Sequence, residues 1–144
     1  MSVPAFGGGV YLADTSARAR AHHSAIRDEW AEALRSRQIA TCSITTLELL
    51  YAARNVEEVL ALEEDEATLR DIPVSISVQH AAITALRDLS RKGDGYHRVK
   101  LPDALIAAAA QEAGTGVLHY DHHYDRLAEV LSFDSRWIAA SGSL

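Results

Sequence analysis

Hydrophobic residues along the chain fall into short apolar runs that are separated by longer amphipathic stretches. The runs at residues 9–13, 39–43, 72–76 and 117–120 have the length and composition of buried β-strands, and residues 136–139 form a further candidate strand. Because Pro73 has no N–H to donate, we expect the strand at 72–76 to lie at an edge of the sheet.

Helical spacing of apolar residues fills the stretches between these runs. It predicts helices over residues 17–37, 45–54, 56–69, 79–91, 102–113 and 124–130. Pro102 occupies a favoured first-turn position, and residues 104–113 are almost wholly apolar, which is typical of a central buried helix. The acidic residues of the 56–69 stretch are explained by a solvent-facing helix surface.

Strands and helices therefore alternate, with connections that are too long for hairpins. This order predicts an α/β fold: a three-layer α/β/α sandwich with a central parallel sheet. A length of 144 residues suits one hydrophobic core, so we expect a single domain over residues 1–144. In such sheets, ligands bind beyond the carboxyl ends of the strands, where the helices begin.

Composition narrows the function classes. Fourteen basic and twenty acidic residues give a net charge of -6, which argues against a protein that coats nucleic acid through backbone charge. The single cysteine cannot form an intramolecular disulfide, residues 1–9 lack a basic targeting region, and no apolar run approaches the roughly 20 residues of a membrane span. We expect a cytoplasmic protein that is neither secreted nor inserted in a membrane.

Four acidic residues, Asp14, Glu48, Asp103 and Asp121, lie where predicted strands give way to helices. In a parallel sheet these positions share one edge, so the sequence predicts that all four face one crevice. Clustered carboxylates repel one another and need cations, and hard oxygen ligands favour Mg²⁺ or Mn²⁺ over zinc. Two such ions would suit phosphodiester hydrolysis, because one activates a water molecule and the other stabilises the departing oxygen.

Each acid also has a structural explanation that the sequence leaves open. Asp14 and Asp121 could be helix N-caps, Thr45-x-x-Glu48 matches a capping box, and a charge at Asp103 suits the first turn of a helix.

Other chemistries have weaker support. The histidines at 119, 122 and 123 could bind zinc, but no cysteine or Glu-x-x-His spacing completes a site. Cys42 falls in a predicted buried strand, and the chain has no G-x-S-x-G nucleophile elbow. Ser16 stands where an aspartyl phosphotransferase would need a second Asp.

Four segments occur in order along the chain: LADTSA, TTLELLYAAR, LPDALIAAAA and VLHYDHHYDRLA. Together they resemble the PIN-domain family and, more narrowly, the VapC toxins of bacterial type II toxin-antitoxin systems. The resemblance implies an endoribonuclease that uses Mg²⁺ or Mn²⁺, a cognate antitoxin that inhibits it, and a homodimer.

The resemblance also implies roles for individual residues. It implies metal contact by Asp14, Asp103 and Asp121, with Glu48 binding through water or orienting the nucleophile. Supporting positions near the metal would be Thr15, Ser16 and Asp125. Helix capping by Thr15 and Ser16, and a solvent-exposed position for Asp125, are the alternatives.

The segment 91–100 is the most basic in the chain and leads into the helix that carries Asp103. We expect Arg98 and Lys100 to contact RNA and Tyr96 to stack on a base, with a solvated loop as the alternative. Two functions therefore compete: a metal-dependent endoribonuclease, and a PIN-like domain that binds RNA or a protein partner without catalysis. The presence of all four acids favours the enzyme.

Overall fold

A computed structural model describes residues 3–144 and has a central sheet of five parallel strands in the order β3-β2-β1-β4-β5. In the central strand, Leu12 pairs with Ala40 on one side and Val117 on the other. The strands are β1 (Tyr11–Ala13), β2 (Ile39–Cys42), β3 (Arg70–Ile72), β4 (Gly116–His119) and β5 (Ser135–Trp137).

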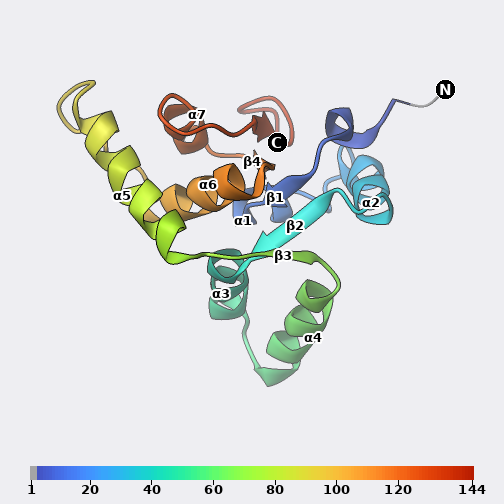
Figure 1. The fold of residues 1–144 in the computed structure, drawn as a ribbon. Coiled ribbons are helices and arrows are strands. Elements are labelled where there is room, and N and C mark those ends of the chain that lie inside the picture. Colours follow the sequence, from blue (N-terminus) through green and yellow to red (C-terminus); the bar gives the residue numbers. More distant parts are fainter. Residues whose placement is uncertain (1–2) are drawn as a thin grey trace.

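Helices connect the strands and cover the sheet (Figure 1). They are the 3-10 helix η1 (Ala5–Gly8) and the α-helices α1 (Thr15–Arg18), α2 (Arg27–Arg35), α3 (Ser43–Ala52), α4 (Val56–Ala67), α5 (Ile76–Ser90), α6 (Leu101–Ala113) and α7 (His123–Leu127). The pair α3 and α4 extends away from the rest of the fold, beside β2 and β3 (Figure 1).

Alternating strand residues divide the hydrophobic core into two clusters. Leu12 and Val117 point into one cluster, which they share with α5, α6 and α7. Tyr11 and Leu118 point into the other, together with residues of η1, α1 and α2. The sheet thus lies between two helical layers, which confirms the predicted three-layer α/β/α sandwich.

Helix α6 is the central helix, as its sequence predicts. Four successive alanines, 107–110, are fully buried, and their small side chains let the helix lie close to its neighbours. Gly114 ends the helix in the left-handed conformation, with φ of 70°, and the chain turns directly into β4. Because α6 runs back across the sheet before β4, its first turn lies at the carboxyl edge of the strands.

The single helix expected over residues 17–37 is wrong. The chain forms α1 and α2, and residues 19–26 between them are turns. Several N–H groups there bond three residues back, as Ala21 does to Arg18 and Ile26 to His23. The His23 ring also accepts the N–H of Ala25 at 3.3 Å, which competes with helical bonding.

Other predicted elements differ by smaller shifts. The expected strand at 72–76 lies at β3, and Pro73 follows it rather than interrupting it. Its expected place at a sheet edge is confirmed. The remaining predicted helices and strands appear with ends displaced by a few residues.

Glu66 anchors the α3–α4 pair to the sheet through a buried polar network. Its Oε1 accepts hydrogen bonds from the hydroxyls of Thr41 at 2.6 Å and Thr46 at 3.0 Å. Its Oε2 forms an ion pair with Arg18, whose Nε donates to the carbonyl of Ala13 at 3.0 Å. The network therefore holds the end of β1 in place.

Replacing Glu66→Ala should lower the free energy of unfolding by about 3 kcal/mol, because it leaves the buried guanidinium of Arg18 without a carboxylate. Glu58→Ala, which removes the exposed ion pair with Arg54, should change it far less. Urea denaturation of both variants measures the difference. Equal effects would mean that the buried pair contributes no more than a surface one.

Candidate active site

The sheet topology brings three of the four predicted acids to the carboxyl edge of adjacent strands. Asp14 directly follows β1, Asp121 lies two residues after β4, and Glu48 lies in α3, the helix that follows β2. Asp103 reaches the same edge differently, since α5 and not a strand precedes α6. The expectation that Asp103 follows a strand is wrong, but the reversed direction of α6 brings it to the predicted place.

Asp14 uses one carboxylate oxygen to cap a helix and leaves the other free. Its Oδ2 accepts from the N–H of Ser16 at 3.1 Å and from the Ser16 hydroxyl at 2.6 Å, so Asp14 is the N-cap of α1. Its Oδ1 is buried and has no hydrogen-bond partner among residues 3–144. The Ser16 hydroxyl also accepts the N–H of Tyr120 at 2.9 Å, which ties α1 to the segment after β4. Thr15 is the first residue of α1 and does not cap it.

Asp103 is the most perturbed acid of the group. It is 4% exposed; its Oδ1 accepts from the Tyr124 hydroxyl at 3.2 Å, and its Oδ2 is buried without a partner. Burial, followed by the negative charges of Asp14 and Asp121, raises its pKa to about 7, although Lys100 opposes the shift. Neither oxygen accepts a backbone N–H of α6, so Asp103 does not cap the helix.

Glu48 does not form the capping box that its sequence context allows. Helix α3 begins at Ser43, so Thr45 already lies inside the helix, buried, with its hydroxyl 3.5 Å from the Cys42 sulfur. Glu48 Oε1 is buried without a partner. Burial and the charge of Asp14 raise the pKa of Glu48, and Lys100 lowers it.

Lys100 brings a positive charge into this acidic group. Its ammonium donates to Asp121 Oδ2 at 2.8 Å, and that bond raises the pKa of the lysine. Burial raises the pKa of Asp121, but the bonds from Lys100 and from the N–H of His123 outweigh it, so the net shift is downward. The ammonium thus partly balances a cluster that would otherwise carry only negative charge.

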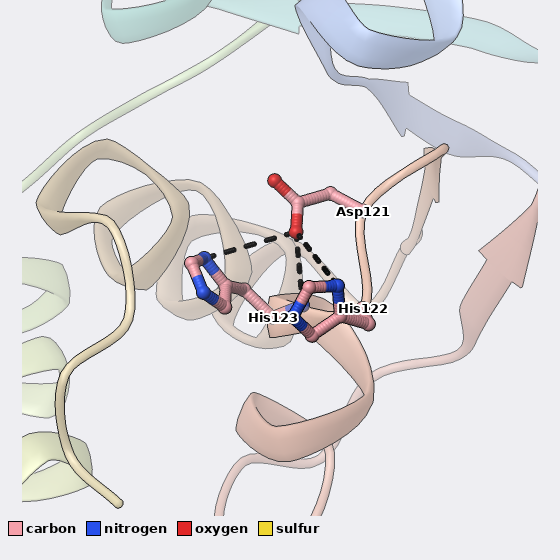
Figure 2. Close-up of side chains that lie close together, drawn as sticks. All are labelled: Asp121, His122 and His123. Atoms are coloured by element: carbon pink, nitrogen blue, oxygen red, sulfur yellow. Dashed lines mark hydrogen bonds and ion pairs between the residues drawn. The ribbon is translucent and has the colours of Figure 1, made fainter. Parts of the chain in front are cut away.

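The three histidines do not form one site. His122 and His123 flank Asp121, with their Nδ1 atoms 4.0 Å and 3.7 Å from its Oδ1 (Figure 2). His119 is fully buried, and burial lowers its pKa to about 4. Its Nδ1 accepts the N–H of Asp121 at 3.2 Å, and its Nε2 lies 2.8 Å from the Ser135 hydroxyl. His119 therefore positions the backbone of Asp121.

Asp125 links α7 to the last strand. Its two oxygens accept from the Ser135 hydroxyl at 2.9 Å and the Trp137 indole N–H at 3.0 Å. Neither Ser135 nor Trp137 could be identified as a partner of Asp125 from the sequence. The same is true of the Tyr124 hydroxyl, which donates to Asp103. A tertiary contact places each of them, and no local spacing signals it.

Two side chains of the basic segment 91–100 are held by contacts with residues 126–129. Tyr96 donates its hydroxyl to Glu129, and the guanidinium of Arg126 lies 4.7 Å from the centre of its ring. Lys92 pairs with the same glutamate. Arg98 is exposed, and its guanidinium makes no hydrogen bond or ion pair with residues 3–144.

The unpaired oxygens of three of these acids suit a divalent cation. Asp14 Oδ1, Glu48 Oε1 and Asp103 Oδ2 are all buried and unpaired, and the charges of Asp14 and Asp121 act on Asp103. Buried acceptors without partners are costly in a folded protein, and hard cations are the ligands that oxygen groups of this kind bind.

Comparisons with known proteins agree with this geometry. The model of the PIN domain matches residues 10–130. The chain belongs to the PIN-domain family. Ribonuclease VapC18 of Mycobacterium tuberculosis is 37% identical over 136 residues, covering 94% of this chain and 99% of the relative. Ribonuclease VapC21 from the same species is 35% identical over 138 residues, covering 92% and 96%.

A solved structure supports the fold of this PIN domain. The DNA-bound VapBC complex from Salmonella typhimurium superposes with a TM-score of 0.72 at 18% identity, covering 90% of this chain and 98% of that one. Among the helices that the structure describes, none is long and apolar enough to cross a membrane.

The Asp103→Asn variant of this PIN domain tests the carboxylate cluster against helix capping. The raised pKa of Asp103 means that the folded state holds a proton that the unfolded state loses above pH 4. Stability without metal should therefore fall as the pH rises from about 4 to 7, by roughly 4 kcal/mol at most for a shift of this size. The variant lacks the titrating carboxyl group, so its stability should not show this fall. It should therefore be more stable than the wild type at pH 8.

Urea denaturation in EDTA at pH 5 and pH 8 provides the measurement. Asn retains an oxygen to accept from Tyr124, so the comparison isolates the charge. A variant less stable than the wild type at pH 8 would show that Asp103 stabilises the helix and is not repelled by its neighbours.

Proposed function

We propose that this chain is a divalent-metal-dependent endoribonuclease, using Mg²⁺ or Mn²⁺, and the toxin of a type II toxin-antitoxin system. The main support for this proposal is a set of buried, unpaired oxygens at one edge of the sheet, on Asp14, Glu48 and Asp103. The relatives named ribonuclease VapC support the choice of RNA as the substrate.

The four acids would have different roles in the site. Asp14, Asp103 and Asp121 would hold the cation, and Glu48 would bind it through water or orient the attacking water. A bound divalent cation lowers the pKa of water to yield the nucleophile and stabilises the departing oxygen. Ser16 keeps one oxygen of Asp14 occupied so that the other faces the site.

Lys100 and Arg98 would bring the RNA to the acids. A chain with a net charge of -6 needs local cations to bind phosphate, and both side chains lie at the entrance to α6. The Lys100 ammonium would move from Asp121 to a substrate phosphate once a metal ion neutralises the carboxylates. Tyr96, which is half-buried against the core and has Arg126 over its ring, would stack on a base of the RNA.

An exposed apolar surface on α3 and α4 fits a partner protein. Its largest exposed side chains are Leu47, Tyr51, Val56 and Leu60, and Leu47 and Tyr51 lie beside Glu48 in one shallow pocket. Exposed apolar patches of this kind mark interaction sites. We propose that a cognate antitoxin binds here and places basic side chains on the acidic site. We also propose that the chain forms a homodimer and acts in the cytoplasm.

A PIN-like domain that binds RNA or a protein without catalysis is the alternative. Binding alone gives no reason to keep three unpaired carboxylate oxygens buried together.

Cleavage of total cellular RNA should require Mg²⁺ or Mn²⁺ and should fall by about 100-fold or more in Asp14→Asn, because the amide keeps the shape but removes the ligand charge. Glu63→Gln, which removes an exposed charge on α4, is the matched control and should cleave normally. Mapping new 5′ ends with and without EDTA measures both. Undiminished cleavage in EDTA would exclude the proposed metal chemistry, and binding without any cleavage would favour the alternative.

A further inference from the structure

His123 points a ring nitrogen at two acids of the site. It is the first residue of α7, and its side chain is 19% exposed. Its Nδ1 lies 3.6 Å from Asp103 Oδ2 and 3.7 Å from Asp121 Oδ1. Asp103 Oδ2 is buried and has no hydrogen-bond partner. His123 Nδ1 therefore lies no more than 3.7 Å from one oxygen of each acid.

The distance from Nδ1 to each acid oxygen fits that between neighbouring ligands of one cation. Ligand atoms that bind one ion at about 2.0–2.2 Å in tetrahedral or octahedral geometry lie roughly 3.0–3.5 Å apart at adjacent positions. The two measured separations from Nδ1 exceed this range by a few tenths of an ångström or less. Small side-chain rotations would close the remaining gap.

The hydrogen bonds around His123 leave its Nδ1 able to bind a metal. The N–H of Lys100 donates to Nδ1 at 3.3 Å, so the ring proton is on Nε2 and Nδ1 carries a lone pair. At 3.3 Å this hydrogen bond is long, so it competes weakly with metal binding at Nδ1. The Lys100 ammonium binds Asp121 Oδ2, and Oδ1 accepts the N–H of His123 at 3.0 Å, so a second lone pair of Oδ1 remains for an ion.

We infer that His123 is a nitrogen ligand to the cation held by Asp103 and Asp121, and that this mixed site selects Mn²⁺ over Mg²⁺. The inference rests on the proposed metal-dependent function and specifies which ion the site prefers. Imidazole suits transition ions, whereas Mg²⁺ prefers oxygen donors and water. A cluster of carboxylates alone would not discriminate in this way.

His122 supplies the matched control. Its Nδ1 is 4.0 Å from the same Asp121 oxygen (Figure 2), and ligand atoms of Asp121, His122 and His123 lie within 4.8 Å of one another. The side chain of His122 is 72% exposed, however, and that of His123 only 19%. The two neighbouring histidines therefore differ in position and burial but not in chemistry.

Pulsed electron paramagnetic resonance of the Mn²⁺-loaded protein tests the inference. The wild type and His122→Gln should show coupling of Mn²⁺ to a directly bound imidazole ¹⁴N, and His123→Gln should not. Competition calorimetry should show the ratio of Mn²⁺ to Mg²⁺ affinity falling about tenfold in His123→Gln. It should fall in His123→Asp also, which replaces the nitrogen with an oxygen donor.

Loss of the signal in His122→Gln, or its persistence in His123→Gln, would overturn the assignment. If His123→Gln does not fold, labelling the His122→Gln variant with ¹⁵N-histidine decides: with His122 removed, the coupling must persist and change to that of ¹⁵N. Mn²⁺ that binds the wild type without nitrogen coupling would contradict the inference and leave the proposed nuclease intact. No binding of any divalent ion to the wild type would contradict the proposed function itself.

Discussion

Repulsion among buried carboxylates is the constraint on which the rest of the site depends. The parallel sheet brings the acids after β1, β2 and β4 to one edge, and α6 adds Asp103 from the opposite chain direction. Burial and neighbouring negative charge hold the pKa of Asp103 near 7, far above the usual value for an aspartate. The folded chain keeps these groups together at a cost, and a bound cation would remove that cost.

The surrounding structure fixes the acids without using up their oxygens. Ser16 binds one oxygen of Asp14, Tyr124 binds one oxygen of Asp103, and His119 holds Asp121 through its backbone N–H. The Arg18–Glu66 pair restrains the carbonyl directly before Asp14. Each contact orients a carboxylate while an oxygen stays available, which is how rigid elements position a metal centre.

The fold could be predicted from the sequence because hydrophobic periodicity controls which faces are buried. Asp14, Glu48 and Asp121 were predicted for the same reason: a parallel sheet places strand ends at one edge. Asp103 follows α5 and not a strand, and it reaches this edge because α6 runs back across the sheet. Contacts between distant segments could not be predicted, since nothing near residue 119 indicates that its ring bonds Ser135. The break between α1 and α2 was missed because the turn residues retain helical spacing while local hydrogen bonds replace the helical ones. For His123, the sequence showed a histidine near an acid but not which nitrogen faces Asp103.

Proton release on metal binding shows whether a cation relieves the repulsion at Asp103. Calorimetric titration of Mn²⁺ in buffers of different ionisation enthalpy counts the protons that leave the protein. With the pKa of Asp103 at about 7, most of one proton should be released at pH 6.5 and very little at pH 8.5. Asp103→Asn should release markedly less at pH 6.5. Equal release by the wild type and the variant at pH 6.5 would contradict the account, because Asp103 would then not be the strained acid that the cation relieves.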